Sequence, residues 1–115
     1  MIPLITNEQR AQLLANGAEF DRNPAFDPFP VVKLFTPDAG ATWLLAAIEP
    51  GSSDIAYGLC DLGLGFAELG SVYISEIETV RGRLGLPVER DLYFIPSKPL
   101  SVYAEEAQRR GLITD

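Results

Sequence analysis

The sequence predicts an α+β fold: an antiparallel meander sheet of about five strands, with short helices at the N-terminus, in the middle and at the C-terminus. Apolar and β-branched segments separated by turn residues run from residue 31 to residue 74, as in consecutive antiparallel strands. Helix signals stand before this region, directly after it and near the end of the chain, without the regular alternation of a parallel sheet. The length of 115 residues predicts a single domain over residues 1–115.

The N-terminal helix is expected over residues 7–15. Thr6 and Gln9 have the spacing of a capping box, in which each side chain accepts a hydrogen bond from the other residue's backbone N–H. The pair Asn16-Gly17 is a frequent helix end. Three prolines in residues 21–30 then exclude a helix or a central strand, so an irregular connection is expected there.

The sheet is expected to follow this connection. Its first two strands are separated by Thr36-Pro37-Asp38-Ala39-Gly40, which is rich in turn formers. The strands themselves are enriched in β-branched, aromatic and aliphatic residues. They are predicted at residues 31–35, 42–48, 55–61, 70–74 and 91–95.

The two later helices are predicted from their first residues. Ser75 and Glu78 have the spacing of a second capping box, and Ser101 is expected to cap the closing helix. Gly70, just before the middle helix, is expected to supply a backbone conformation that larger residues cannot adopt.

The glycine-rich stretch does not indicate a nucleotide site. Gly63-Leu64-Gly65 begins like a dinucleotide fingerprint, but Glu68 stands where the third glycine should be and would repel a pyrophosphate. These glycines are therefore interpreted as residues that let strands pack closely or form bulges.

The composition excludes several catalytic classes. There is no histidine, so a Ser-His-Asp triad, a Cys-His dyad and His-ligated zinc are excluded within the chain. Cys60, the single cysteine, cannot form an intrachain disulfide and is expected to be a buried structural residue. We expect no cofactor. The cysteine content and the lack of an apolar run of about 20 residues favour a cytoplasmic protein without a membrane role.

The charge distribution is the clearest functional signal. The chain has a net charge of -7, and no Lys or Arg occurs from Leu34 to Val80. Such a segment should reject bare nucleic acid and favour a basic protein partner, a hard cation or simple solubility. Its carboxylates are Asp38, Glu49, Asp54, Asp61, Glu68, Glu76 and Glu78.

Some of these residues have more than one interpretation. Asp54, Asp61 and Glu68 lie around neighbouring predicted strands, so they are candidates for a Mg²⁺ or Ca²⁺ site or for an acid/base pair. A solvated acidic face is the favoured interpretation of these residues. No metal site is predicted. Three arginines near the middle helix are expected to complement its dipole and to pair with Glu78, Glu89 or Asp91. The candidate binding residues are Asp54, Asp61, Glu68, Glu76, Trp43, Arg81 and Arg90.

A further signal is a set of segments spread over nearly the whole chain: Val32 to Asp38 with Thr42-Trp43, Tyr57 to Gly65, Glu68-Leu69-Gly70, Ser75 to Glu78, Arg81-Gly82 and Leu86 to Asp91. These segments resemble a family of small bacterial proteins known only as a domain of unknown function, whose members are often encoded on plasmids and other mobile elements. The resemblance implies a bacterial cytoplasmic origin and an accessory role for a mobile element. It implies no activity and no catalytic residue.

Two functional hypotheses follow. The first is a non-enzymatic interaction module whose acidic surface binds a basic protein partner, such as a nucleic-acid-handling or defence protein. The second is a small enzyme that uses carboxylates with Arg81 or Arg90 on a polar substrate. The first is favoured, because the chain has few conventional catalytic groups.

Overall fold

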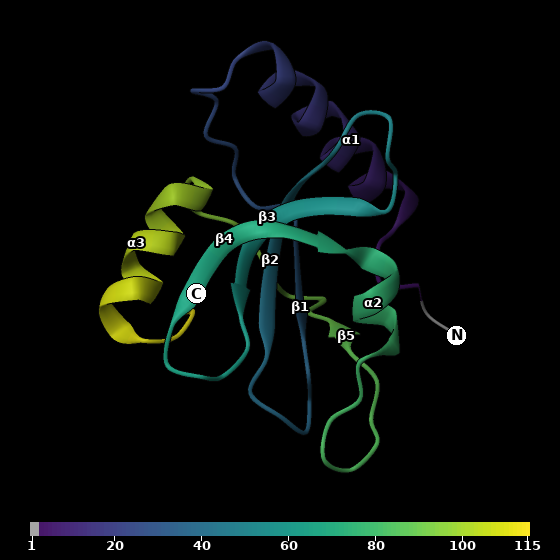
Figure 1. Ribbon diagram of the computed structural model, residues 1–115, viewed down its shortest axis with the longest axis vertical. Helices are drawn as coiled ribbons and strands as arrows, with labels where there is room; N and C mark the ends of the chain where they lie inside the picture. Colours follow the sequence, from purple (N-terminus) through teal and green to yellow (C-terminus); the bar gives the residue numbers. More distant parts are fainter. Residues whose placement is uncertain (1–2) are drawn as a thin grey trace.

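The computed structural model describes residues 3–115 and confirms the α+β fold, with a five-stranded antiparallel sheet and three helices (Figure 1). The helices are α1 (Asn7–Arg22), α2 (Ile74–Thr79) and α3 (Leu100–Arg110). The strands are β1 (Val32–Phe35), β2 (Thr42–Ile48), β3 (Ile55–Asp61), β4 (Ala67–Tyr73) and β5 (Glu89–Arg90).

The strand order is β4-β3-β2-β1-β5, and all neighbouring strands are antiparallel. The first four strands form the predicted meander, and β5 returns to the free side of β1. Residues that face one another across the strands form rows, so the register decides which side chains share a face. One such row runs across the whole sheet through Arg90, Leu34, Trp43, Cys60 and Glu68.

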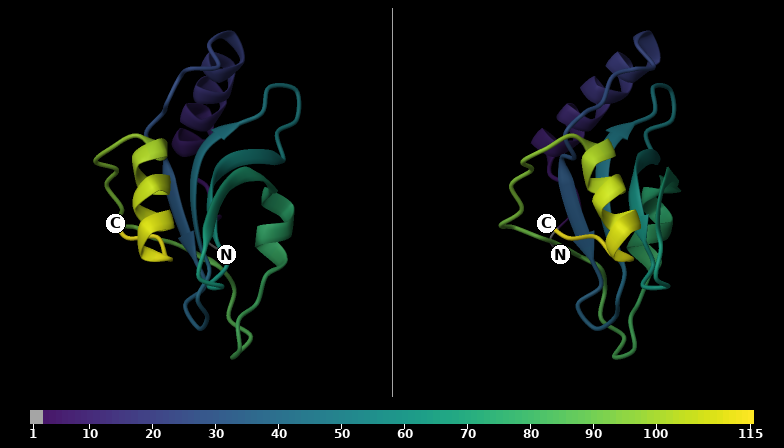
Figure 2. Two further views of the ribbon diagram at one scale, coloured as in Figure 1. Left: turned by 60° about the vertical axis from the view of Figure 1, so that its left-hand side comes forward. Right: turned by 90° about the vertical axis from the view of Figure 1, so that its left-hand side faces the viewer.

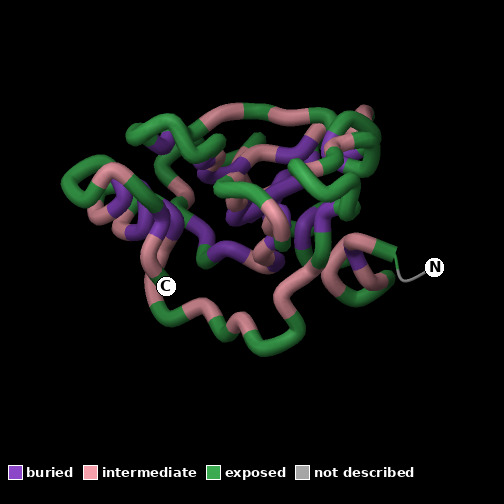
Figure 3. Tube along the Cα trace, turned by 90° about the horizontal axis from the view of Figure 1, so that it is seen from below, coloured by how far each residue is buried: buried purple, intermediate pink, exposed green. Residues whose placement is uncertain are grey.

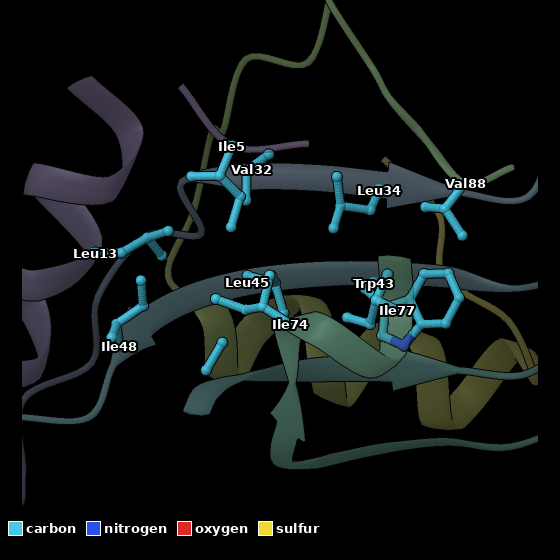
Figure 4. Packing of buried hydrophobic residues seen from close by; sticks show 11 residues of the cluster. Ile5, Leu13, Val32, Leu34, Trp43, Leu45, Ile48, Ile74, Ile77 and Val88 are labelled. Atoms are coloured by element: carbon cyan, nitrogen blue, oxygen red, sulfur yellow. The ribbon is translucent and has the colours of Figure 1, made fainter. Parts of the chain in front are cut away.

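The two faces of the sheet pack against different helices. On one face, Leu13 of α1 and Ile74 and Ile77 of α2 cover a cluster that includes Trp43 and Leu45 (Figure 4). On the other face, α3 packs on a second cluster, and α2 and α3 therefore lie on opposite sides of the sheet (Figure 2). The buried positions are concentrated in the central strands and in the inner side of α3 (Figure 3).

A β-bulge in β2 positions α1. The register between β2 and β3 shifts between Leu45 and Ala47, so Ala46 is an extra residue. The bulge also reverses the side-chain alternation, because Ile48 joins the cluster of Leu45, which regular alternation would prevent. The carbonyl of Ala46 accepts a hydrogen bond of 2.8 Å from the Asn16 side chain. The bulge therefore provides a backbone carbonyl that attaches α1 to β2 by a hydrogen bond.

The prediction that the first helix ends at Ala15 is wrong, because α1 continues through Asn16 and Gly17 to Arg22. Both residues are buried against β2. A Cβ at Gly17 would lie 1.8 Å from the carbonyl oxygen of Ile48, so the absent side chain allows the helix to approach the strand backbone. The capping box of Thr6 and Gln9 is confirmed, with two hydrogen bonds of 3.0 Å.

The predicted fifth strand is displaced. Residues 91–95 are irregular, and the sheet instead uses Glu89–Arg90, which pairs with β1. The Asp91 side chain accepts a hydrogen bond of 2.9 Å from the Tyr93 backbone N–H, which is a local turn that competes with strand pairing. Tyr93 and Ile95 are consequently exposed.

The predicted serine caps are also corrected. Helix α2 begins at Ile74 and α3 at Leu100, so Ser75 and Ser101 lie one residue inside their helices and do not cap them. The expectation for Gly70 is wrong as well. It does not adopt a positive φ, and an added Cβ would meet nothing within 4 Å. The interpretation of Gly63 and Gly65 as close-packing or bulge glycines within strands is also wrong, because both lie in the β3–β4 turn, with φ of 80° and 93°. Close packing in the sheet is instead found at Gly58, where a Cβ would lie 2.1 Å from the Leu44 carbonyl oxygen.

Candidate functional site

An open cleft of about 420 Å³ lies between α1 and the hairpin formed by β2 and β3. In Figure 1, the turn that joins these strands rises beside α1. The cleft lies where Gly17 brings α1 against the end of β2 and the helix continues past this contact to Arg22. We call this feature the acidic cleft. It is lined by Gly17, Phe20, Asp21, Pro24, Ala47, Ile48, Glu49, Pro50, Ile55, Tyr57 and Ser71.

An aromatic pair forms one wall of the acidic cleft. The rings of Phe20 from α1 and Tyr57 from β3 meet edge to face, with centroids 5.6 Å apart and an interplanar angle of 72°. Such a pair adds attraction to the apolar area that it buries and fixes both rings. A neighbouring hollow of about 290 Å³, which includes Leu69 of β4 and Leu100 of α3, shares these two rings.

Two exposed carboxylates, Asp21 and Glu49, line the acidic cleft. Neither forms an ion pair within residues 3–115, and the residues lining the cleft include no Lys or Arg. Asp21 also lies in the last turn of α1, where the helix dipole disfavours a negative charge. The cleft therefore combines two carboxylates with an aromatic wall, and both features attract a cationic side chain.

Asp54 and Asp61, two of the predicted binding residues, bond to backbone N–H groups. Asp54 accepts hydrogen bonds from the Ser75 backbone N–H at 2.9 Å and from its hydroxyl at 2.6 Å. Asp61 is only 4% exposed and accepts from the backbone N–H groups of Gly63, at 2.9 Å, and Ile113, at 3.0 Å. Both carboxylates hold segments of the fold together.

The same arrangement recurs outside this pair. Asp38 accepts from the backbone N–H groups of Leu84 at 2.6 Å and Leu86 at 3.3 Å, which ties the β1–β2 turn to the segment after α2. Asp27 accepts from the backbone N–H and the hydroxyl of Ser101 in the first turn of α3. A carboxylate at this position satisfies a helix N-terminal N–H, as a capping side chain does.

The carboxylates of the acidic segment thus divide by residue type. Its aspartates accept hydrogen bonds from the backbone, whereas its glutamates are exposed and their carboxylates accept no hydrogen bond from residues 3–115. A shorter side chain is held closer to its own backbone, so it loses less conformational entropy when it ties two segments. The free glutamates are Glu49, Glu68, Glu76 and Glu78.

The remaining predicted binding residues do not come together. Trp43 is 4% exposed and belongs to the core beneath α2. It lies in the same row as Glu68 and Arg90, but these two residues stand at opposite edges of the sheet, roughly 19 Å apart at the usual strand spacing. Glu76 is exposed on α2, and Arg81 lies just after that helix.

The three arginines near α2 do not form the expected ion pairs with described carboxylates. Arg81 instead donates to the backbone carbonyls of Glu78 at 3.0 Å and Val80 at 2.8 Å, and thus complements the C-terminal end of α2. Arg90 donates to the carbonyl of Pro3 at 2.7 Å. The carboxylate of Asp91 instead pairs with Lys33, with 3.5 Å between Oδ2 and Nζ.

Cys60 is half-buried beside the cluster under α2. Burial raises the pKa of its thiol to about 11, so the neutral thiol predominates at neutral pH and is a weak nucleophile. Within residues 3–115, no three Cys, Asp or Glu side chains gather where they could hold a metal ion. No helix in this range is both long and apolar enough to cross a membrane.

Sequence reasoning missed the acidic cleft because it ended the first helix too early. With a helix that continues to Arg22, Phe20 lies three residues after Gly17 and seven residues after Leu13. Residues at these spacings share one face of a helix. The neighbouring Asp21 then lies on the cleft side. This periodicity was the available signal, and the Asn16-Gly17 pair concealed it.

The fold and the cleft define an α+β protein with an aromatic-walled acidic recess. A family model described as a protein of unknown function, DUF2958, matches residues 4–114, and the chain belongs to this family. The resemblance noted from the sequence is therefore confirmed. Neither the search of curated proteins nor that of solved structures finds a match.

Proposed function

We propose that this protein is a non-enzymatic interaction module that binds a basic protein partner through the acidic cleft. The observation that carries the proposal is the presence of Asp21 and Glu49 beside the Phe20–Tyr57 wall, without a basic residue in the cleft lining. A Lys or Arg side chain of the partner would place its charge between the carboxylates and its alkyl stem or guanidinium plane against the rings.

The exposed glutamates extend this acidic surface beyond the cleft. Glu68 on β4 and Glu76 on α2 have free carboxylates, so they contribute to the long-range field that steers a basic partner. Proteins that handle nucleic acid bind it through basic surfaces. An acidic module can occupy such a basic surface in place of DNA. The proposal includes a cytoplasmic location and the mobile-element setting that the family resemblance implies.

The location of Asp21 supports a role in binding. A negative charge in the last turn of a helix costs a few tenths of a kcal/mol at an exposed site. Replacing Asp21 by Asn should therefore raise the free energy of unfolding slightly while it weakens partner binding. A residue that stabilises the fold would show the opposite change in stability, and chemical denaturation distinguishes the two.

The test is affinity capture from a bacterial lysate, with the captured proteins identified and quantified by mass spectrometry. The wild-type protein is compared with Asp21→Asn/Glu49→Gln and with the control Glu89→Gln/Glu105→Gln, which removes the same charge from exposed sites outside the cleft lining. We expect basic proteins on the wild type and on the control, reduced about tenfold on the cleft variant. Equal capture by all three, or preferential capture of acidic proteins, would contradict the proposal.

A further inference from the structure

The outer edge of β4 is free for strand pairing. β4 is the last strand of the sheet order on its side, and its register with β3 is continuous from Ala67 to Tyr73, without a bulge. It contains no proline and no lysine, and Glu68 is its only charged residue. Natural proteins usually protect a long edge strand with such devices, because unpaired backbone groups attract other strands.

The register shows which backbone groups are unpaired. The Ile74 backbone N–H donates to the Asp54 carbonyl at 2.8 Å, and these residues continue the β3–β4 register by one position. In an antiparallel ladder every second pair is of this bonded type, so Val72, Gly70 and Glu68 also direct their backbone groups toward β3. Leu69 and Ser71, between them, direct their N–H and C=O groups outward. Neither forms an outward backbone hydrogen bond with another segment of residues 3–115.

Both faces of this edge are partly open at its centre. Leu69 is 39% exposed, Tyr73 is 50% exposed and Ser71 is also exposed. On the opposite face, a Cβ at Gly70 would meet nothing within 4 Å. An added strand therefore finds both the backbone groups and the space on either side of them.

The free edge continues into the acidic cleft. Leu69 and Ser71 lie opposite Leu59 and Tyr57 of β3, so their side chains are on the face of Tyr57. Ser71 lines the acidic cleft, and Leu69 lines the neighbouring hollow that shares Tyr57 with it. A strand paired with β4 would thus place alternate side chains beside the cleft and the others beside Glu68.

We propose that β4 accepts an extended basic segment of the partner as an additional antiparallel or parallel strand. This inference rests on the proposed function and specifies its binding mode. Main-chain hydrogen bonds to Leu69 and Ser71 supply affinity, and Lys or Arg side chains facing Glu68 and the acidic cleft supply specificity. A second copy of this chain fits poorly, because it would bring a second glutamate-bearing edge and another net charge of -7 against the first.

The first measurement is amide hydrogen exchange by NMR, with a peptide of alternating Lys and Thr, as long as β4, as the probe. A peptide of alternating Glu and Thr is the control. We expect the Leu69 and Ser71 N–H groups to exchange rapidly in the free protein and about tenfold more slowly with saturating Lys-Thr peptide. The Glu-Thr peptide should change nothing.

The second measurement is the affinity of the same peptide for edge variants. Ser71→Pro removes an outward N–H without removing a β3–β4 hydrogen bond, whereas Ser71→Thr keeps that N–H. We expect binding to weaken about tenfold for the proline variant and to stay within about twofold for the threonine variant. Melts monitored by circular dichroism show whether Ser71→Pro is folded. If it is not, the exchange measurement on the wild type decides whether the peptide pairs with β4.

Failure of this inference differs from failure of the proposed function. Peptide binding that depends on Asp21 and Glu49 but leaves the Leu69 and Ser71 exchange rates unchanged would overturn strand addition and retain the cleft. Absence of Lys-Thr binding at low salt would also overturn strand addition, while the capture experiment alone decides the proposed function. Concentration-dependent protection of these amides in the free protein would assign the edge to a second copy and likewise overturn the inference.

Discussion

At the scale of single residues, the aspartates and the glutamates of the acidic segment have different tasks. Asp38, Asp54 and Asp61 accept hydrogen bonds from backbone N–H groups of distant segments. The glutamates remain exposed, so their charge is available to a partner. The sequence indicates the total charge of this surface, but the division depends on which backbone N–H groups the fold leaves unpaired nearby.

We predict that Asp54→Ala lowers the free energy of unfolding by about 1–2 kcal/mol, because the Ser75 backbone N–H and hydroxyl both lose their acceptor. Urea denaturation measures the change. Glu76→Gln removes a charge next to Ser75 on α2, and its carboxylate accepts no hydrogen bond from residues 3–115. This variant is the control and should stay within about 0.5 kcal/mol of the wild type. A loss of equal size in both variants would show that charge, rather than these hydrogen bonds, stabilises α2.

Cys60 gives a pH-dependent prediction. Its pKa rises from 9.0 to about 11 in the folded protein, so folding favours the protonated thiol. The stabilising contribution is complete below pH 9 and is lost as the pH rises toward 11. Unfolding free energies measured across this range should therefore decline more steeply for the wild type than for Cys60→Ala, in which the other titrating groups are unchanged.

Alkylation rates give an independent check on the same group. At pH 8 the thiolate fraction of the folded protein should be about one in a thousand, so iodoacetamide should react far more slowly than with the unfolded chain. Equal rates for folded and urea-unfolded protein at the same pH would contradict the raised pKa.

At the scale of elements, local sequence pattern determines the bounds of the central strands, whereas tertiary packing determines the length of α1. The strands β2 and β3 follow the sequence pattern to the residue, because apolar alternation and flanking turns are local properties. The length of α1 contradicts its local stop signal, because Asn16 bonds to the Ala46 carbonyl of the β2 bulge and Gly17 packs against the Ile48 backbone. The acidic cleft was missed for the same reason: it forms where the second half of α1 meets the end of β2.

The two glycines Gly17 and Gly70 test this account. Alanine at position 17 gains helix propensity of about 1 kcal/mol, but its Cβ would overlap the Ile48 carbonyl oxygen, so we expect a net loss of at least about 2 kcal/mol. Gly70→Ala, which points into open space, should be neutral or slightly stabilising. Thermal melts of both variants decide it, and a stable Gly17→Ala would mean that α1 does not contact β2 so closely.

At the scale of the whole molecule, the chain has a net charge of -7, and exposed carboxylates lie on β4, on α2 and in the acidic cleft. Self-repulsion of like charges opposes compactness to a small extent. The composition alone predicts this, and it also predicts a preference for basic partners. It does not predict where a partner binds, because that depends on the strand order that leaves β4 at an edge.

Reversing the charge of Glu68 and Glu76 to Lys should leave the fold intact, because both side chains are exposed and accept no hydrogen bond from residues 3–115. The melting temperature should change little, since reduced self-repulsion is offset by a positive charge in the first turn of α2. Capture of basic partners should fall. Differential scanning calorimetry and the lysate capture are performed on the same preparation. Unfolding of the double variant would show that these glutamates are structural, and unchanged capture would place the interface elsewhere.

The polar ties between distant segments also have a kinetic consequence. The meander β1 to β4 pairs strands that follow one another directly, and such local topology favours rapid folding. The hydrogen bonds of Asp27 with Ser101 and of Asp61 with Ile113 instead join residues 74 and 52 positions apart. We therefore expect these ties to form after the rate-limiting step.

Stopped-flow kinetics would make this order of events visible. Asp27→Ala should accelerate unfolding and leave the refolding rate nearly unchanged, since a contact absent from the transition state affects only the unfolding limb. Ile48→Val, in the central strand β2, should instead slow refolding. The sheet would then be the part of the molecule that forms first, and the aspartate ties would determine how long the completed structure persists.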